Sequence, residues 1–232
     1  NIKELEQDIV QRTKGEWYSF NISSGNTGHV MIDHNDYKWI LRRDGSLIVY
    51  NDNNTISDSY DDEYKIITNI AGQGGLPEAA NCMAVDHNGT VWVGTNDGLA
   101  QFYSTSKIFK QGVNYDASRI LVPRNDGSGQ ADYLMSGESI LAICVDAANN
   151  LWVGTKNGVF YISNNGLTEY YHFTQDNSPL LSNTVQDIAI NKYGDVFFGT
   201  DKGIISLRGR ATEGHETNSD VVVYPNPVRQ GY

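Results

Sequence analysis

One spacing pattern recurs four times along the chain and constrains its fold more than any other feature. In each copy an aromatic residue lies six positions after an Asp or Asn and six positions before a Gly. Three copies also carry a Gly two positions after the aromatic residue. Because the spacing persists where the residue types change, it indicates a repeated structural unit. The repeated positions are Asp33, Trp39 and Gly45; Asp86, Trp92, Gly94 and Gly98; Asp146, Trp152, Gly154 and Gly158; and Asn191, Phe197, Gly199 and Gly203.

Each copy has the pattern of a small antiparallel meander of strands. In the second copy, residues 83–85 alternate as a strand does, and Asn-Gly at 88–89 tolerates the positive φ of a hairpin turn. Asp86 opens that turn, where a short carboxylate accepts hydrogen bonds from backbone N–H groups two or three residues later. Val-Trp-Val at 91–93 is apolar on both faces, which requires cover on both sides. We therefore assign the repeated Asp and Asn side chains to turn structure.

The repeat length predicts the fold class. The aromatic residues lie 53, 60 and 45 positions apart, which matches a four-stranded β-propeller blade better than a helical or leucine-rich repeat. One blade cannot bury both of its faces alone, so neighbouring blades must pack against it. We predict an all-β protein with about four four-stranded antiparallel propeller blades, as a fragment of a larger, seven-bladed ring. An open β-solenoid and a sandwich are the alternatives.

The expected domain boundaries follow the repeats. Residues 1–27 are expected to form the outer part of a preceding blade and the lead into the first repeat, with a short helix at 1–14 as the alternative. The composition becomes polar and aperiodic after residue 210, which predicts a linker and then the first strand, at 221–224, of a following β-domain. An outer strand of the fourth blade is the alternative for 221–224. The repeats themselves occupy 28–209, at about 28–68, 81–110, 139–174 and 184–207.

Charge, cysteine content and motif content argue against several functions. A formal net charge of -11 disfavours nucleic acid and anionic membrane surfaces as partners. No apolar run approaches the ~20 residues of a membrane-spanning helix. Cys82 and Cys144 lie on predicted inner strands at different levels, so we expect two buried free thiols and no disulfide. Metal-ligand spacing, a nucleophile elbow and a phosphate-binding loop are all missing, so we expect no catalytic residue, metal or cofactor.

Residues 111–138 interrupt the regular repeat length between the second and third copies. Two arms, 120–124 and 131–134, flank a Gly-rich turn and predict an inserted hairpin. Insertions on a rigid scaffold are frequent binding sites. Alternatively, the hairpin only covers a blade edge or packs on a neighbouring domain. The candidate binding residues are Arg119, Arg124, Asp126, Asp132 and Tyr133.

The repeat motif resembles that of a known propeller group. Asp-x-x-Gly-x-hydrophobic-Trp-hydrophobic-Gly-Thr-x-x-Gly at 86–98 is similar to the regulator-propeller repeats of periplasmic sensors in hybrid two-component systems. The order of the intervening segments is more similar to the PorZ family of type IX secretion system propellers in Bacteroidota. The segments that carry this second resemblance are 122–127, 131–134, 172–174, 177–180, 198–200, 203–206 and 223–228.

These resemblances imply a function. The PorZ resemblance implies a non-catalytic, exported protein in the periplasm or at the outer-membrane surface. It also implies a complex with PorU-like, PorV-like and PorQ-like proteins and recognition of lipopolysaccharide or another glycan. A periplasmic sensor domain that binds a glycan and signals to a kinase is the alternative. A polysaccharide-active enzyme is a third, less favoured class.

Overall fold

The structure is a computed structural model, and it describes residues 18–20, 22, 26–67, 76, 78–112 and 117–208. The expectations for residues 1–14, for the linker after residue 210 and for the strand at 221–224 fall outside these ranges. All regular structure apart from one short 3₁₀ helix is β-strand within the described part of the chain.

Two of the repeats form four-stranded antiparallel sheets whose strands pair in chain order. In chain order these are the first sheet, which the repeat of Asp33 forms, and the third sheet, which the repeat of Asp146 forms. In both, the second strand carries the repeat Trp and pairs with a strand along each of its edges. The strands are β1 (Thr27–Ile32), β2 (Lys38–Arg42), β3 (Leu47–Asn51) and β4 (Glu63–Ile67), and β10 (Ile140–Val145), β11 (Leu151–Thr155), β12 (Val159–Ile162) and β13 (Glu169–Phe173).

The other two sheets have three strands each in the described residues, where the sequence predicted four. After β7 the chain enters the 3₁₀ helix η1 (Thr105–Lys107), and only a bridge between Gln101 and Ser118 remains at the position of a fourth strand. The chain after β16 lies outside the described residues. The strands are β5 (Ala80–Val85), β6 (Val91–Thr95) and β7 (Gly98–Phe102), and β14 (Val185–Ile190), β15 (Asp195–Thr200) and β16 (Gly203–Arg208).

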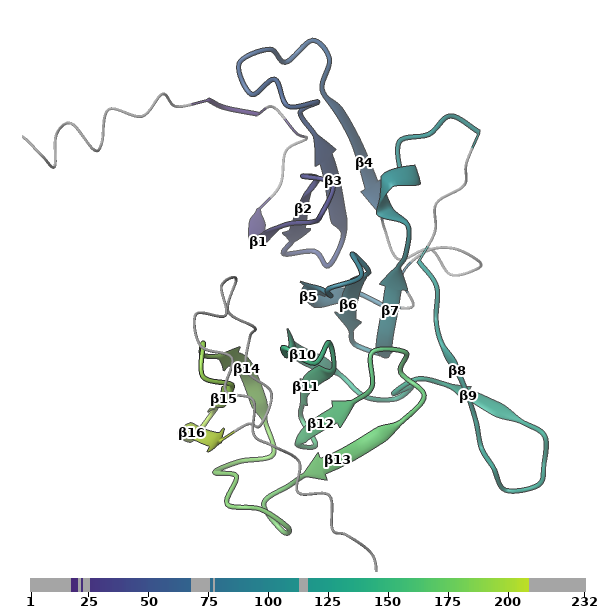
Figure 1. The fold of residues 1–232 in the computed structure, drawn as a ribbon, viewed down its shortest axis with the longest axis vertical. Coiled ribbons are helices and arrows are strands. Elements are labelled where there is room, and N and C mark those ends of the chain that lie inside the picture. The colour runs from purple at the N-terminus through teal and green to yellow at the C-terminus, as the bar shows by residue number, and fades with distance from the viewer. Residues whose placement is uncertain are drawn as a thin grey trace, which may run out of the picture.

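The four sheets follow one another around an arc, with the first strand of each on the inner side (Figure 1). Strands β5 and β10 contact each other there, as do β10 and β14. This is the arrangement of propeller blades around an axis, so the chain is part of a β-propeller. Below, β1–β4, β5–β7, β10–β13 and β14–β16 are called blades one to four.

The core consists of apolar layers between successive blades. Trp39 of blade one packs with Phe102 of blade two, at a ring-centroid distance of 5.1 Å. Trp92 packs in the layer between blades two and three, and Trp152 in the layer between blades three and four. Both are buried, at 1% and 5% exposure, and they lie in separate sheets. The prediction that neighbouring blades cover the apolar faces of the sheets is therefore confirmed for the faces that lie between blades.

The outer described face of blade four is more open than the faces between blades. Leu99 pairs with Gly94 in blade two, and Val159 pairs with Gly154 in blade three. These two side chains are 1% and 0% exposed. The matching residue of blade four, Ile204, is 74% exposed, and Phe197 on the same face is 38% exposed. Phe197 thus keeps the repeat spacing but does not have the burial of the three Trp residues, because no described blade follows it.

The repeat Asp residues hold both the turn and the aromatic side chain. Asp33 Oδ1 accepts hydrogen bonds from the N–H groups of Asn35 and Tyr37 at 2.8 and 3.0 Å. Its other oxygen accepts the indole N–H of Trp39 at 3.0 Å. Asp86 makes the same three bonds. The predicted turn role is confirmed, although the donors lie two and four residues later, and the bond to Trp accounts for the six-residue spacing.

Blades three and four vary this arrangement. The second oxygen of Asp146 accepts the hydroxyl of Tyr161 at 2.8 Å, and the buried indole N–H of Trp152 has no hydrogen-bond partner. Asn191 Oδ1 still accepts the N–H groups of Tyr193 and Asp195, both at 2.9 Å. Its aromatic partner is Phe197, which has no N–H to satisfy. A neutral side chain is therefore sufficient at this one position.

Candidate functional site

The insertion between blades two and three carries all five predicted binding residues. It contains the two-stranded antiparallel ribbon β8 (Leu121–Pro123) and β9 (Ala131–Tyr133). Val122 faces the layer between blades two and three, whereas Leu121 and Tyr133 on the other face of the ribbon are 55% and 44% exposed. The ribbon extends away from the blades (Figure 1). Its inner face is therefore held by the core, and its tip is accessible.

Asp97 fastens both ends of the insertion to blade two. Arg119 donates to its backbone oxygen at 2.9 Å and to its carboxylate at 3.2 Å. The N–H of Gly137 donates to the other carboxylate oxygen at 2.6 Å. This backbone hydrogen bond, assisted by the charge of Arg119, lowers the pKa of Asp97. The sequence analysis did not propose Asp97, because the two ends that it holds lie 22 and 40 residues away.

Arg119 and Tyr133 meet at the base of the ribbon. The guanidinium of Arg119 lies over the ring of Tyr133, 4.2 Å from its centroid. A cation over an aromatic face is attractive, and here it joins the start of the insertion to the end of β9. These two predicted residues therefore support the ribbon.

Arg124, Asp126 and Asp132 lie toward the tip. Arg124 and Asp132 form a two-pronged ion pair with both N–O distances at 2.7 Å, and the pair lowers the pKa of Asp132. Asp126 Oδ1 accepts the N–H of Ser128 at 2.9 Å within the turn, and the hydrogen bonds from Ser128 lower its pKa. Both acids are therefore anionic at neutral pH, and the only nearby guanidinium is already paired.

An open groove lies between the ribbon and blade three. Its volume is about 790 Å³. Four of the five predicted residues line it, and Arg119 does not. Its far wall comes from blade three and includes Phe160, Ile162, Leu167 and Glu169, which the sequence analysis did not propose. The sequence carries no local signal for them, because the groove exists only once the ribbon lies beside blade three.

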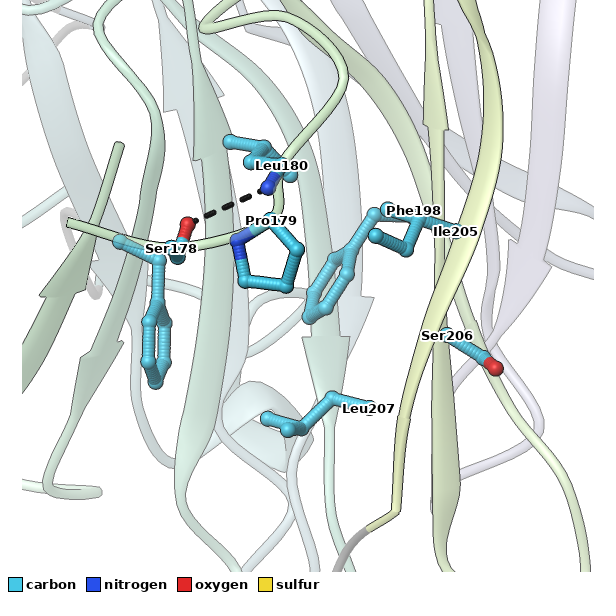
Figure 2. Close-up of a pocket in the computed structure, with 8 residues that line it drawn as sticks. Ser178, Pro179, Leu180, Phe198, Ile205, Ser206 and Leu207 are labelled. Atoms are coloured by element: carbon cyan, nitrogen blue, oxygen red, sulfur yellow. Dashed lines mark hydrogen bonds between the residues drawn. The ribbon is translucent and has the colours of Figure 1, made fainter. Parts of the chain in front are cut away.

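A second, smaller pocket lies at the outer edge of blades three and four. Its volume is about 70 Å³, and mostly apolar side chains line it. Figure 2 shows the ring of Pro179 facing that of Phe198, with Leu207 also at the pocket. The drawn hydrogen bond, from Leu180 N–H to Ser178 Oγ at 3.4 Å, only stabilises the loop. Among the described residues that line this pocket, none carries a charged side chain.

Other chemistry is scarce in the part of the chain that the structure describes. No group of three or more His, Cys, Asp or Glu side chains there is arranged to hold a metal ion. Cys82 and Cys144 are free thiols, as predicted, although both are only partly buried. Burial raises the pKa of both thiols, that of Cys82 to about 12. Among the same residues, no helix is long and apolar enough to cross a membrane.

Comparison with known proteins supports the repeats and the fold. The profile of the "Two component regulator propeller" family matches residues 74–97 and 134–157. A structure of PorZ, an essential surface component of the type IX secretion system of Porphyromonas gingivalis, matches with 28% identity and a TM-score of 0.73. The match covers 92% of this chain and 30% of PorZ. A search of curated proteins gave no match.

Two further structures share the fold. They are extracellular domains of hybrid two-component systems of B. thetaiotaomicron. The BT3049 domain has 18% identity and a TM-score of 0.61, over 84% of this chain and 23% of that one. The BT4673 domain has 19% identity and a TM-score of 0.54, over 81% and 22%. The chain thus spans less than a third of each of these three relatives and contains regulator-propeller repeats within part of a larger propeller.

Proposed function

We propose that this chain is part of a non-catalytic, exported propeller that acts as an interaction module of a PorZ-type complex at the bacterial surface. The similarity to PorZ over 92% of the chain supports this proposal most strongly. The partners implied by that resemblance are PorU-like, PorV-like and PorQ-like proteins, with lipopolysaccharide or another glycan as a further ligand. The ribbon and its groove are the surface of this chain that we assign to the contacts with partner proteins.

The chemistry of the described residues agrees with a non-catalytic role. The repeat carboxylates are engaged in turns and with aromatic side chains, and the ion pair of the ribbon joins Arg124 to Asp132. A glycoside hydrolase requires two carboxyl groups placed across a scissile bond. A screen of the purified protein against plant, host and bacterial polysaccharides is expected to show no turnover, and cleavage of any one of them would refute a non-catalytic role.

A sensor function is the second candidate, because the matching family profile is that of two-component regulator propellers. Deletion of the gene in its own organism separates the two functions. For a secretion component, cargo normally attached to the surface should be lost from it, and transcription induced by glycans should be normal. Normal cargo attachment with a lost transcriptional response would refute the secretion proposal and support the sensor.

A further inference from the structure

The groove beside the ribbon has an excess of negative charge. Four carboxylates line it, from Asp126, Asp132, Glu138 and Glu169, against the single guanidinium of Arg124. That guanidinium is paired with Asp132 through two contacts of 2.7 Å. An incoming anion would therefore have to displace Asp132 from Arg124 and approach three further carboxylates. Electrostatic complementarity favours a cationic occupant.

Two of these carboxylates are available for such an occupant. Glu169 is exposed at the start of β13, and its carboxylate has no hydrogen-bond or ion-pair partner among the described residues. Asp126 is exposed and bonds only to Ser128 within its own turn. Glu138 and Asp132 are already engaged, with Asn157 and Arg124 respectively. Asp126 and Glu169 come from the ribbon and from blade three, so they lie on opposite walls.

The groove between these walls is also apolar. Val122 and Phe160 are partly buried, Ile162 is buried, and Leu167 is 53% exposed beside them. An extended polypeptide points alternate side chains in opposite directions. Such a segment could place one set of apolar side chains on this floor while its cationic side chains reach the walls. A volume of about 790 Å³ lies in the range of ligand clefts in general.

We propose that the groove between the ribbon and blade three binds an extended segment of a partner protein in which Lys or Arg alternates with apolar residues. The inference rests on the proposed function, since it names the class of partner for the surface assigned there. It also assigns anionic lipopolysaccharide to a location other than this groove.

A peptide-binding experiment tests the proposal. The probes are two fluorescein-labelled peptides, four repeats of Lys-Val and four repeats of Glu-Val, titrated with the full protein by fluorescence anisotropy. The Lys-Val peptide should bind at low salt and bind more weakly at high salt, because exposed charges are screened. The Glu-Val peptide should not bind. Equal binding of both peptides would overturn the proposal.

Substitutions locate the binding. Asp126→Asn together with Glu169→Gln removes two charges at nearly constant shape and should weaken Lys-Val binding about three- to tenfold, as expected for two exposed ion pairs. Asp176→Asn together with Asp201→Asn is the matched control, since both are exposed carboxylates in turns that do not line the groove. It should leave binding unchanged. Equal weakening by the control would show non-specific attraction to an acidic protein and would refute the site.

The outcome is separable from the proposed function. Peptide binding at the groove by a protein whose deletion leaves cargo attachment intact would refute only the secretion role. Lost cargo attachment with no Lys-Val binding would refute only the groove assignment.

Discussion

The bond between the repeat Asp and the repeat Trp predicts energetic coupling that differs from blade to blade. In blade two, Asp86 is 2% exposed and Trp92 is 1% exposed, and the indole N–H donates to Asp86 Oδ2 at 3.2 Å. Asp86→Asn retains the oxygen that accepts the two turn N–H groups, but it places an amide donor against the indole donor. A hydrogen bond to a charged group contributes about 1.5–3 kcal/mol, and this is the expected cost in the Trp background.

Trp92→Phe removes the indole donor, so the same Asp86→Asn substitution should then cost much less. A double-mutant cycle should therefore give a coupling free energy of about 1–2 kcal/mol between the two positions. Blade four already carries this pair of changes, as Asn191 and Phe197. Free energies of unfolding come from urea titration followed by far-UV circular dichroism, since the Trp substitution alters fluorescence.

Blade three provides the control cycle. Asp146 contacts Tyr161 and not Trp152, whose indole N–H has no partner. Asp146→Asn and Trp152→Phe should then be additive within about 0.5 kcal/mol. Burial and the hydrogen bond to Asp146 raise the pKa of Tyr161 to about 12, so Asp146→Asn and Tyr161→Phe should be coupled instead. Equal coupling of the Asp–Trp pair in both blades would refute the assignment of the spacing to this hydrogen bond.

Further predictions concern packing, a thiol and the ribbon. A Cβ at Gly94 would lie 2.5 Å from both Cys82 Sγ and Ile140 Cγ2, whereas at Gly199 the nearest atom is 3.5 Å away. In urea titrations Gly94→Ala should thus cost about 1–3 kcal/mol and Gly199→Ala less than about 0.5; equal costs would contradict blade packing. With a pKa of about 12, Cys82 should resist Ellman's reagent at pH 8 until urea is added, and rapid labelling of the folded protein would show that it is accessible. Because the pKa of Asp97 is lowered from 3.8, its contribution is present above that value and lost as the pH falls through the lowered pKa. Asp97→Asn should accordingly speed hydrogen exchange in residues 119–134 at neutral pH, and its difference from the parent should shrink as the pH falls below 3.8. Exchange equal to that of the parent at neutral pH would refute the anchor.

The features that could be predicted from the sequence are those with local causes. A short Asp or Asn side chain followed by residues that tolerate positive φ forms the same turn in each repeat, as at Gly89 and Gly194, both with φ +80°. The Val-Trp-Val pattern at 91–93 predicts a strand that is buried on both faces, and all three residues are buried in β6. These signals need no knowledge of the rest of the chain.

The features that could not be predicted depend on contacts between distant residues. Asp97 holds Arg119 and Gly137, and Phe160 meets the ribbon only after blades two and three are in place. A repeat pattern predicts that blade two has four strands, but it does not indicate that only three of them are present among the described residues, before the insertion. The insertion breaks the repeat length, so the sequence points to its five candidate residues. The blade-three wall of the groove has no such signal in the sequence.

The missing strand of blade two and the groove have a common structural cause. Among the residues that the structure describes at the position of a fourth strand along β7, only Ser118 bridges to Gln101, and the chain then turns outward. On its return, Leu134 packs into the layer that contains Trp92, and its backbone oxygen accepts the N–H of Leu99 at 3.4 Å. The base of the insertion thus covers the blade edge, as the alternative interpretation expected, while the same path holds β8 and β9 beside blade three. Covering an edge and forming a groove are therefore two consequences of one insertion, and the Asp126→Asn substitution at its tip leaves the covering contacts in place.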